Sequence, residues 1–146
     1  MDVTDLTAYP TNLFYDLPNQ IWYEPLNDGS IRTGFTPLAI ELAGEVLVFS
    51  PKRAGKDFEA QRSFAVIECG KWVGAARAAF AGIVVAINDE LVRRPALLNR
   101  DAFGAGWMLT VRAEASNWRD GLTTGSAVAD AFSAWMRSDA YKDRRG

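Results

Sequence analysis

Short β-type runs, each closed by a residue that interrupts a strand, constrain the fold of this 146-residue chain more than any other feature. The longest apolar runs, around residues 46–49 and 83–87, have the length of a strand and fall far below the roughly 18 residues of a membrane span. Asn27-Asp28-Gly29 separates two β-rich runs, and Asp-Gly tolerates the positive φ of a tight turn. The sequence therefore predicts a mainly β protein with an early hairpin over residues 20–35 and no membrane span.

Two helices are predicted beside these strands, and residues 95–98 suggest a further helical turn. Thr36 and Pro37 provide an N-cap and a first-turn proline, and Gly44 can end that helix in a left-handed conformation. A C-terminal helix is predicted over about residues 126–142. It carries apolar residues on one face: Val128, Phe132, Trp135 and Met136.

The length of the chain fits one domain, and its 49% hydrophobic content is enough to build a core. We therefore expect a single domain over residues 1–146, with a core of about residues 19–113. Within this core, Trp107 and the apolar residues of segments 82–88 and 107–112 are expected to be buried.

Composition narrows the classes of function. The chain has 16 Lys and Arg residues against 18 Asp and Glu, so no net field favours nucleic acid or an anionic membrane as a partner. Histidine, the commonest general base and metal ligand, is absent from the sequence, and no carboxylate cluster of the calcium-binding type is present. One cysteine and the lack of a secretory signal favour a reducing cytoplasm. We therefore expect a cytoplasmic carrier or accessory protein that has no metal site and is not an enzyme.

Lys71 is the candidate for a functional side chain. It lies in the segment Ile-Glu-Cys-Gly-Lys-Trp-Val-Gly, residues 67–74, between two predicted strands. A turn between two short strands projects a side chain into water while the sheet holds the turn in place. An ordinary surface lysine in a tight turn is the alternative at this point.

The residues around Lys71, taken with others along the chain, resemble the H protein of the glycine cleavage system and its lipoyl-carrier relatives. The resemblance covers about residues 19–112, and the order and spacing of its motifs are specific where each motif alone is weak. Glu68-x-x-Lys71 is followed 11 residues later by Gly82, and then by Gly104-x-Gly-Trp107. The matching positions also include Trp22, Asp28-Gly29, Gly34-Phe-Thr36, Leu42-Ala-Gly44, Pro51, Asn88, Pro95 and Asn99.

The resemblance implies a lipoyl-type barrel-sandwich hybrid with short peripheral helices and a C-terminal helix. It also implies that a lipoate ligase attaches lipoic acid to Lys71 through an amide bond, at the tip of a β-hairpin. Glu68 is then expected to serve recognition by the ligase, while Gly70 and Gly74 leave space beside the arm. Lipoylation would turn a cation into a long neutral arm whose dithiolane exchanges with thiols and carries groups. Biotin is a minor alternative, because biotin carriers resemble Met-Lys-Met at the tip, where this chain has Gly-Lys-Trp.

Four positions depart from the glycine-cleavage pattern. In those H proteins, carboxylates that hold the aminomethyl-loaded arm in a cleft stand at the positions of Ile21 and Ala75, so an amine would lose both ionic partners here. Arg77 instead favours an anionic cargo, and Cys69 stands where the family usually has serine. A surface strand residue facing water is the alternative for Arg77, and a small buried hydrophobe is the alternative for Cys69.

These departures resemble the lipoate-binding proteins of the bacterial heterodisulfide-reductase-like sulfur-oxidation pathway. The main expectation is therefore a lipoyl arm that shuttles sulfur intermediates, with the heterodisulfide-reductase-like complex and sulfurtransferases as partners. The first alternative is an H protein that carries an aminomethyl group between the glycine cleavage enzymes. The second is an unlipoylated interaction module. Trp72 fits either view, since an aromatic residue at a hairpin tip packs on the barrel or meets a partner.

Overall fold

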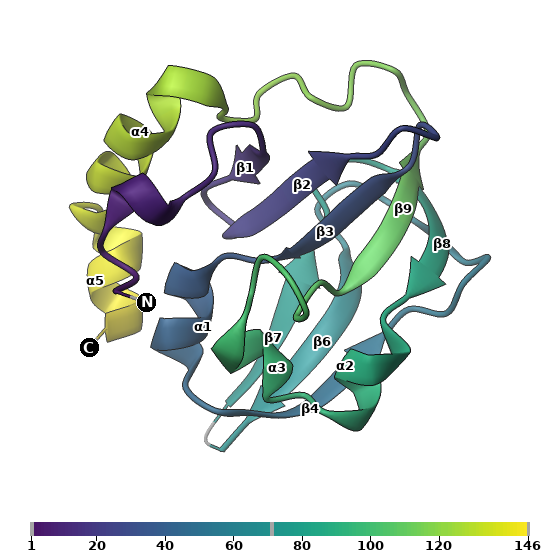
Figure 1. The fold of residues 1–146 in the computed structure, drawn as a ribbon, viewed down its shortest axis with the longest axis horizontal. Coiled ribbons are helices and arrows are strands. Elements are labelled where there is room, and N and C mark those ends of the chain that lie inside the picture. The colour runs from purple at the N-terminus through teal and green to yellow at the C-terminus, as the bar shows by residue number, and fades with distance from the viewer. Residues whose placement is uncertain (1, 71, 146) are drawn as a thin grey trace.

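The computed structural model describes residues 2–70 and 72–145, and the side chains of all of these except residues 144 and 145. In this part of the chain two antiparallel sheets form the body of the molecule (Figure 1). The six-stranded sheet has the order β1-β2-β3-β9-β8-β5, and the three-stranded sheet has the order β4-β6-β7. The strands are β1 (Phe14–Asp16), β2 (Ile21–Pro25), β3 (Ile31–Phe35), β4 (Val46–Pro51), β5 (Asp57–Phe58), β6 (Ser63–Cys69), β7 (Trp72–Arg77), β8 (Gly82–Ile87) and β9 (Leu109–Ala113).

Strand alternation divides the apolar residues between two clusters. In β2, Ile21 and Tyr23 point into the core between the sheets, where they meet residues of β6 such as Ile67. Trp22 points to the opposite face and joins a second cluster with Tyr15 and Phe132. Successive side chains of a strand face opposite sides, so one strand serves both clusters.

The predicted β2–β3 hairpin is present. Pro25 pairs with Ile31, and the turn between them has Gly29 at φ 86°, a conformation that glycine adopts without steric cost. The side chain of Asp28 accepts a hydrogen bond of 2.9 Å from the backbone N–H of Ser30. An Asx contact of this kind stabilises the turn locally.

The expectation that Trp107 is buried is wrong. Trp107 is only partly buried, and the guanidinium of Arg32 lies over its ring, 5.0 Å from the centroid. Trp22 is instead the tryptophan with almost no exposure, 1%. In β8, Val84 is buried while Ile83 and Val85 are 40% and 42% exposed, because the outer face of this strand meets solvent.

The first predicted helix is confirmed as α1 (Pro37–Ala43). The Thr36 hydroxyl accepts a hydrogen bond from the N–H of Ala39, and Gly44 has φ 85° where the helix ends. The other helical segments before the C-terminal region are η1 (Leu6–Ala8), α2 (Asp89–Arg93) and α3 (Leu97–Arg100).

The C-terminal region is not one helix over residues 126–142. It contains η2 (Gly125–Ala127), α4 (Val128–Met136) and α5 (Asp139–Arg145). The break follows from Ser138, whose hydroxyl accepts a hydrogen bond from the N–H of Tyr141 and so favours a new helix start. Phe132 of α4 is fully buried, with its ring 4.5 Å from that of Tyr9 and 5.2 Å from that of Tyr15. Figure 1 shows α4 and α5 stacked beside β1 and α1.

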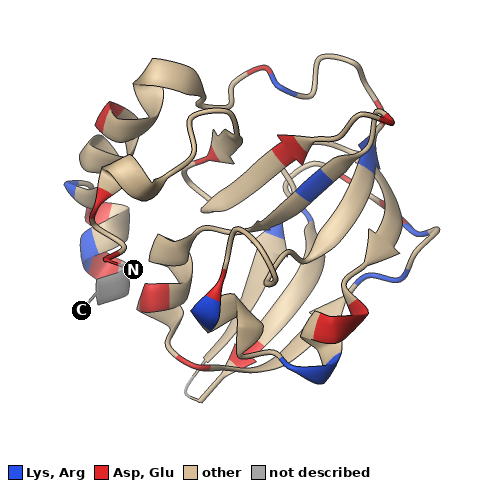
Figure 2. Ribbon diagram, in the orientation of Figure 1, with Lys and Arg blue, Asp and Glu red and all other residues tan. Residues whose placement is uncertain are grey.

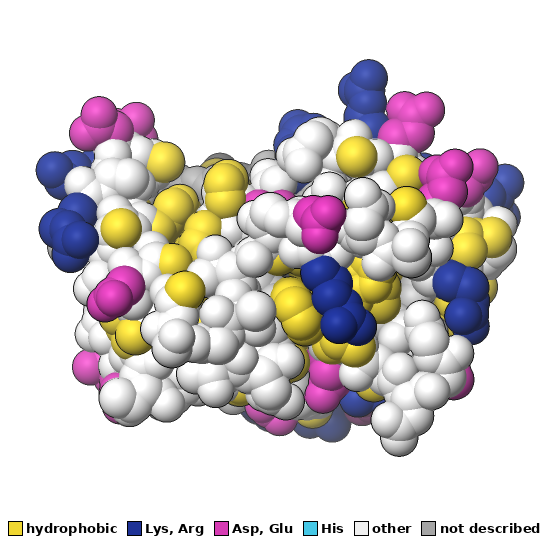
Figure 3. Space-filling model, turned by 90° about the horizontal axis from the view of Figure 1, so that it is seen from above, with side chains coloured by type: hydrophobic (Ala, Val, Ile, Leu, Met, Phe, Trp, Pro, Cys, Tyr) yellow, Lys and Arg dark blue, Asp and Glu magenta, His cyan; other side chains and the backbone are white. Residues whose placement is uncertain are grey.

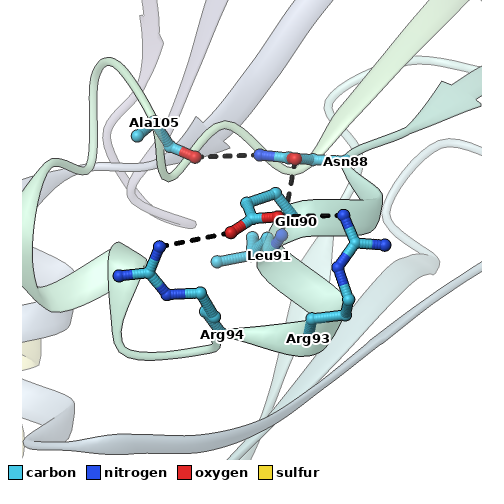
Figure 4. Close-up of polar contacts among 6 residues, drawn as sticks. All are labelled: Asn88, Glu90, Leu91, Arg93, Arg94 and Ala105. Carbon is cyan, nitrogen blue, oxygen red and sulfur yellow. Dashed lines mark hydrogen bonds and ion pairs between the residues drawn. The ribbon is translucent and has the colours of Figure 1, made fainter.

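Asn88 holds α2 against the chain before β9 (Figure 4). Its carbonyl oxygen accepts a hydrogen bond from the N–H of Leu91, and its amide group donates to the carbonyl oxygens of Ala105 and Trp107 at 2.9 and 2.8 Å. Within α2, Glu90 pairs with Arg93 and Arg94 on the surface. The sequence analysis missed α2, although Asn88 followed by two acidic residues is a helix-start signal.

The segment after β9 crosses the end of the molecule that is uppermost in Figure 1. Trp118 anchors it, since its ring lies 5.5 Å from that of Phe14 and 5.4 Å from that of Phe80. The guanidinium of Arg119 lies 5.1 Å from the ring of Phe14. Figure 3 looks down on this end and shows a basic side chain lying across hydrophobic ones.

Acidic and basic residues are interspersed along the elements (Figure 2). Among the described residues, no helix combines the length and the apolar character that crossing a membrane requires.

Candidate functional site

The β6–β7 hairpin carries the segment that was predicted from the sequence. Its two strands are paired up to their ends, where Cys69 is the register partner of Trp72. The chain between these partners consists of Gly70 and Lys71 alone. Lys71 itself lies outside the described residues. Gly70 is exposed, and apart from Gly70 and its chain neighbours no described residue has an atom within 4 Å of the position that a β-carbon there would take.

A cleft of about 230 Å³ runs along β7, one of the two edge strands of the three-stranded sheet. Its walls come mainly from α1 and β7, which lie next to each other in Figure 1. Most of the residues that line it are apolar, although backbone groups and Asn19 add polar surface, and among the described lining residues Arg77 is the only charged one. The lining residues are Asn19, Phe35, Ala39, Ile40, Leu42, Ala43, Ile67, Trp72, Gly74, Ala75 and Arg77.

One part of the cleft lining is polar. Nη1 of Arg77 donates a hydrogen bond to the backbone oxygen of Gln61 at 3.3 Å. Nδ2 of Asn19 donates to Oε1 of Gln61 at 3.2 Å and to Oδ2 of Asp16 at 2.8 Å. These contacts join the turn before β2, the turn before β6 and the end of β7.

The turn before β2 also fixes the start of α1. Gln20 is fully buried, and its Oε1 accepts a hydrogen bond of 2.6 Å from the Thr36 hydroxyl. The backbone oxygen of Gln20 accepts from the N–H of Thr36 at 3.0 Å. Because Thr36 is the N-cap of α1, this network positions the helix that forms one wall of the cleft.

Sequence reasoning missed Gln20 and Gln61. Both have positive φ, 56° and 65°, and they are the non-glycine residues with this conformation in the described part of the chain. Glutamine is not a residue type that marks a left-handed turn, so no local signal could have identified them. Backbone strain of this kind costs about 1–3 kcal/mol and clusters at functional sites.

Trp72 and Ala75 both line the cleft, as does Arg77. Glu68 is exposed between its cross-strand partners Val48 and Val73, and it is not one of the residues that line the cleft. Because cross-strand partners share a face, Glu68 stands on the face of the hairpin opposite to Trp72, the partner of Cys69.

Cys69 is buried at the end of β6, with 8% of its surface exposed. Burial raises the pKa of the Cys69 thiol, so the reactive thiolate is scarce at neutral pH. This placement agrees with the alternative of a small buried hydrophobe.

The structure does not bring Ile21 to the cleft. Its side chain is fully buried between the sheets and belongs to the main core. Phe35, the register partner of Ile21 on β3, lines the cleft in its place. The expectation that Ile21 and Ala75 line one cleft therefore holds for Ala75 alone, because the inward face of β2 is occupied by core packing.

Comparison with known proteins shows that this chain is similar to glycine cleavage H proteins. A family model described as glycine cleavage H-protein matches residues 13–134. Glycine cleavage system H protein 2 of Aquifex aeolicus is 34% identical over 131 residues, which cover 89% of this chain and 81% of that protein. A probable glycine cleavage system H protein 2 of Sulfolobus acidocaldarius is 34% identical over 138 residues, with 93% of each chain covered.

A solved structure supports the same relationship. The crystal structure of a glycine cleavage system H protein from Mycobacterium marinum matches with a TM-score of 0.75 and 27% sequence identity. The match covers 85% of this chain and 98% of that one. The predicted mainly β, lipoyl-type fold with short helices is thereby confirmed.

Proposed function

Because this chain belongs to the glycine cleavage H-protein family, we propose that it is a lipoyl carrier whose lipoic acid is attached to Lys71 by a lipoate ligase. The observation that carries the proposal is the hairpin. Its strands are paired up to Cys69 and Trp72, which leaves only Gly70 and Lys71 between them, and β7 borders a cleft lined mostly by apolar residues. A short connection on a rigid sheet is what an enzyme needs when it modifies one side chain.

The lipoyl group, when bound, supplies a dithiolane that exchanges with thiols and carries groups. The residues of this chain hold the arm and exclude water from it. Small or apolar side chains of α1, among them Ala39, Leu42 and Ala43, face the hairpin across the cleft. They offer an apolar surface to a neutral acyl chain, which gains free energy by leaving water.

The test is intact-mass measurement after incubation with a lipoate ligase, lipoic acid and ATP. The wild-type chain should gain the mass of one lipoyl group, and Lys71→Arg should gain none. A chain that stays unmodified while a known substrate of the same ligase is modified would leave the unlipoylated interaction module as the better account. Retention of the modification in Lys71→Arg would move the attachment site elsewhere.

An aminomethyl group is the first candidate for the cargo. The relatives in Aquifex aeolicus and Sulfolobus acidocaldarius bear the names of glycine cleavage system H proteins. On this candidate the partners are the glycine cleavage enzymes.

A sulfur intermediate is the second candidate, and one observation favours it. None of the described residues that line the cleft is a carboxylate, whereas Arg77 is a lining residue. The planar guanidinium binds oxyanions well, and an ammonium group in the cleft would meet no acidic side chain from these residues. On this candidate the partners are sulfurtransferases and a heterodisulfide-reductase-like complex.

One comparison separates the two candidates. The lipoylated protein is incubated either in its disulfide form with glycine and a glycine decarboxylase, or in its reduced dithiol form with a persulfide donor and a sulfurtransferase. Aminomethyl loading without a sulfur adduct would establish the first candidate. A thiol-reversible sulfur adduct, without aminomethyl loading, would establish the second. We also propose a reducing compartment, the cytoplasm, since the single cysteine of the sequence, Cys69, is a buried free thiol.

A further inference from the structure

We propose that Trp72 and Gly74 form an aromatic platform that positions the lipoyl arm in the cleft, an inference that rests on the proposed attachment at Lys71. Trp72 would then be a positioning residue for the arm, and Gly74 the residue that allows its indole to lie where it does. The platform concerns the arm itself, so it applies to either cargo.

The indole of Trp72 lies directly against the backbone of Gly74. A β-carbon built at residue 74 would stand 2.1 Å from both Cη2 and Cζ3 of the Trp72 ring, far inside van der Waals contact. The two residues are two positions apart in β7, so they share one face of the strand. Only glycine at position 74 leaves this space to the indole.

Core packing does not explain this arrangement. Trp72 is 49% exposed, and it is the tryptophan with the largest exposed fraction among the five of the chain. Exposed apolar surface contributes no burial free energy, so about half of the Trp72 side chain, the largest in the hairpin, does not stabilise the fold. An exposed aromatic beside a functional position is more often used for contact with a ligand or partner.

The position of the Trp72 ring indicates that its ligand is the lipoyl arm. Trp72 directly follows Lys71 in the sequence, and its side chain lines the cleft together with Gly74 and Ala75. Leu42 and Ala43 of α1 line the same cleft. An acyl arm attached at Lys71 would meet a groove lined mostly by apolar residues, with an indole on one wall. Sulfur makes favourable contacts with aromatic rings, so this wall suits a dithiolane better than an aliphatic wall would.

Two variants test separately whether the position of the indole and the presence of the ring matter. Gly74→Ala keeps Trp72 but displaces its indole, and the φ of Gly74 lies outside the left-handed region, so alanine is tolerated by the backbone. Trp72→Leu keeps an apolar side chain without the ring. Val73→Ala is the matched control, because Val73 is 66% exposed on the other face of the same strand.

The experiment uses the lipoylated full-length chain of the wild type and of the three variants. Intact mass first establishes that each carries one lipoyl group, and thermal melting establishes that each is folded. The rate at which a water-soluble phosphine reduces the dithiolane to two thiols is then measured; the phosphine becomes its oxide, and water supplies the oxygen and the two protons. The platform predicts that Gly74→Ala and Trp72→Leu are reduced about two- to tenfold faster than the wild type, the scale of one sulfur–aromatic contact. Val73→Ala should match the wild type.

The outcomes distinguish this inference from the proposed function. Equal reduction rates in all four lipoylated proteins would overturn the platform and leave the carrier function intact. Absence of the lipoyl mass from the wild type would overturn both. If Gly74→Ala fails to fold, Trp72→Leu decides the question, since a half-exposed side chain can be shortened without opening the core.

Discussion

The indole of Trp22 fills the space in which a side chain at Gly34 would stand. The two residues are register partners on β2 and β3, and a β-carbon at Gly34 would lie 2.9 Å from Cζ2 and 3.0 Å from Nε1 of the ring. The ring is 1% exposed, and its N–H donates a hydrogen bond of 3.1 Å to the backbone oxygen of Ala102. Trp22 is thus held by the backbone at Gly34 and by the hydrogen bond to Ala102, and the absence of a side chain at Gly34 is what admits it.

Gly34→Ala should therefore destabilise the protein. The extra methyl group has no free volume, and overpacking of a buried site costs about 1–3 kcal/mol. The free energy of unfolding in urea is the measurement. Gly74→Ala serves as the control, because the indole that it displaces is half-exposed and can move into solvent. Equal losses for the two variants would show that Trp22 is not confined as described.

Phe132→Ala should detach the C-terminal helices from the body of the protein. Phe132 is fully buried against Tyr9 and Tyr15, and truncation of a buried phenylalanine costs about 3–5 kcal/mol. Urea unfolding measures the loss. A change below about 1 kcal/mol would mean that α4 contributes little to the stability of the fold, which its burial contradicts.

Alkaline pH should destabilise the protein through three tyrosines. Burial raises the pKa of Tyr9, Tyr15 and Tyr23 above the ordinary value of about 10. The folded state therefore binds these protons more tightly than the unfolded state, and the stability they provide is complete below about pH 10 and is lost as the pH rises above it.

The melting temperature, measured from pH 7 to 11.5, should stay level and then fall above about pH 10. Tyr15→Phe should reduce the slope of that fall, since one fewer proton is released on unfolding. An unchanged slope in Tyr15→Phe would show that the phenol of Tyr15 ionises as freely in the folded state as in the unfolded one.

Local rules predicted the elements whose signals lie within a few residues of each other. The β2–β3 hairpin followed from Asp28-Gly29, and α1 followed from Thr36, Pro37 and Gly44, each of which acts on its immediate neighbours. The strands on either side of Lys71 were predicted from the residues, and the family resemblance added the expectation of an attachment site at the tip of their hairpin. These parts of the fold needed no knowledge of distant contacts.

The cleft could not be predicted in the same way. Its polar part depends on Asn19 meeting Gln61, residues 42 positions apart whose meeting is set by how two turns converge. Ile21 was misplaced because strand alternation, which turns it into the core, depends on which face of β2 the second sheet covers. Trp107 was misplaced because it lies before β9, which begins at Leu109, and its ring meets the guanidinium of Arg32 instead of the core.

The charge at position 77 should decide what the arm can carry. If the cargo is an oxidised sulfur group, Arg77→Gln should lower sulfur loading by about tenfold or more, the value of one charge-assisted hydrogen bond. Ala75→Glu should lower it in the same direction, because a carboxylate would then line the cleft. Sulfur loading is measured as a thiol-reversible mass gain on the lipoylated protein.

The expectation is different if the cargo is a cationic aminomethyl group. The extent of aminomethyl loading should then rise in Ala75→Glu and change little in Arg77→Gln. Substitution of Ile21 by an acid is not an informative variant, because the carboxylate would be buried in the core and would unfold the protein. Loading of either cargo that is insensitive to both changes would show that the cleft does not select the charge of the cargo.

The measurement that tests the carrier function most directly is a tryptic digest of the protein isolated from its own cells. Trypsin cleaves after Arg62, Lys71 and Arg77, but an amide on Lys71 removes the charge that trypsin requires there. The account predicts a single peptide over residues 63–77 that carries one lipoyl mass on Lys71. Recovery of the two unmodified peptides 63–71 and 72–77, from cells whose other lipoyl proteins are modified, would contradict it.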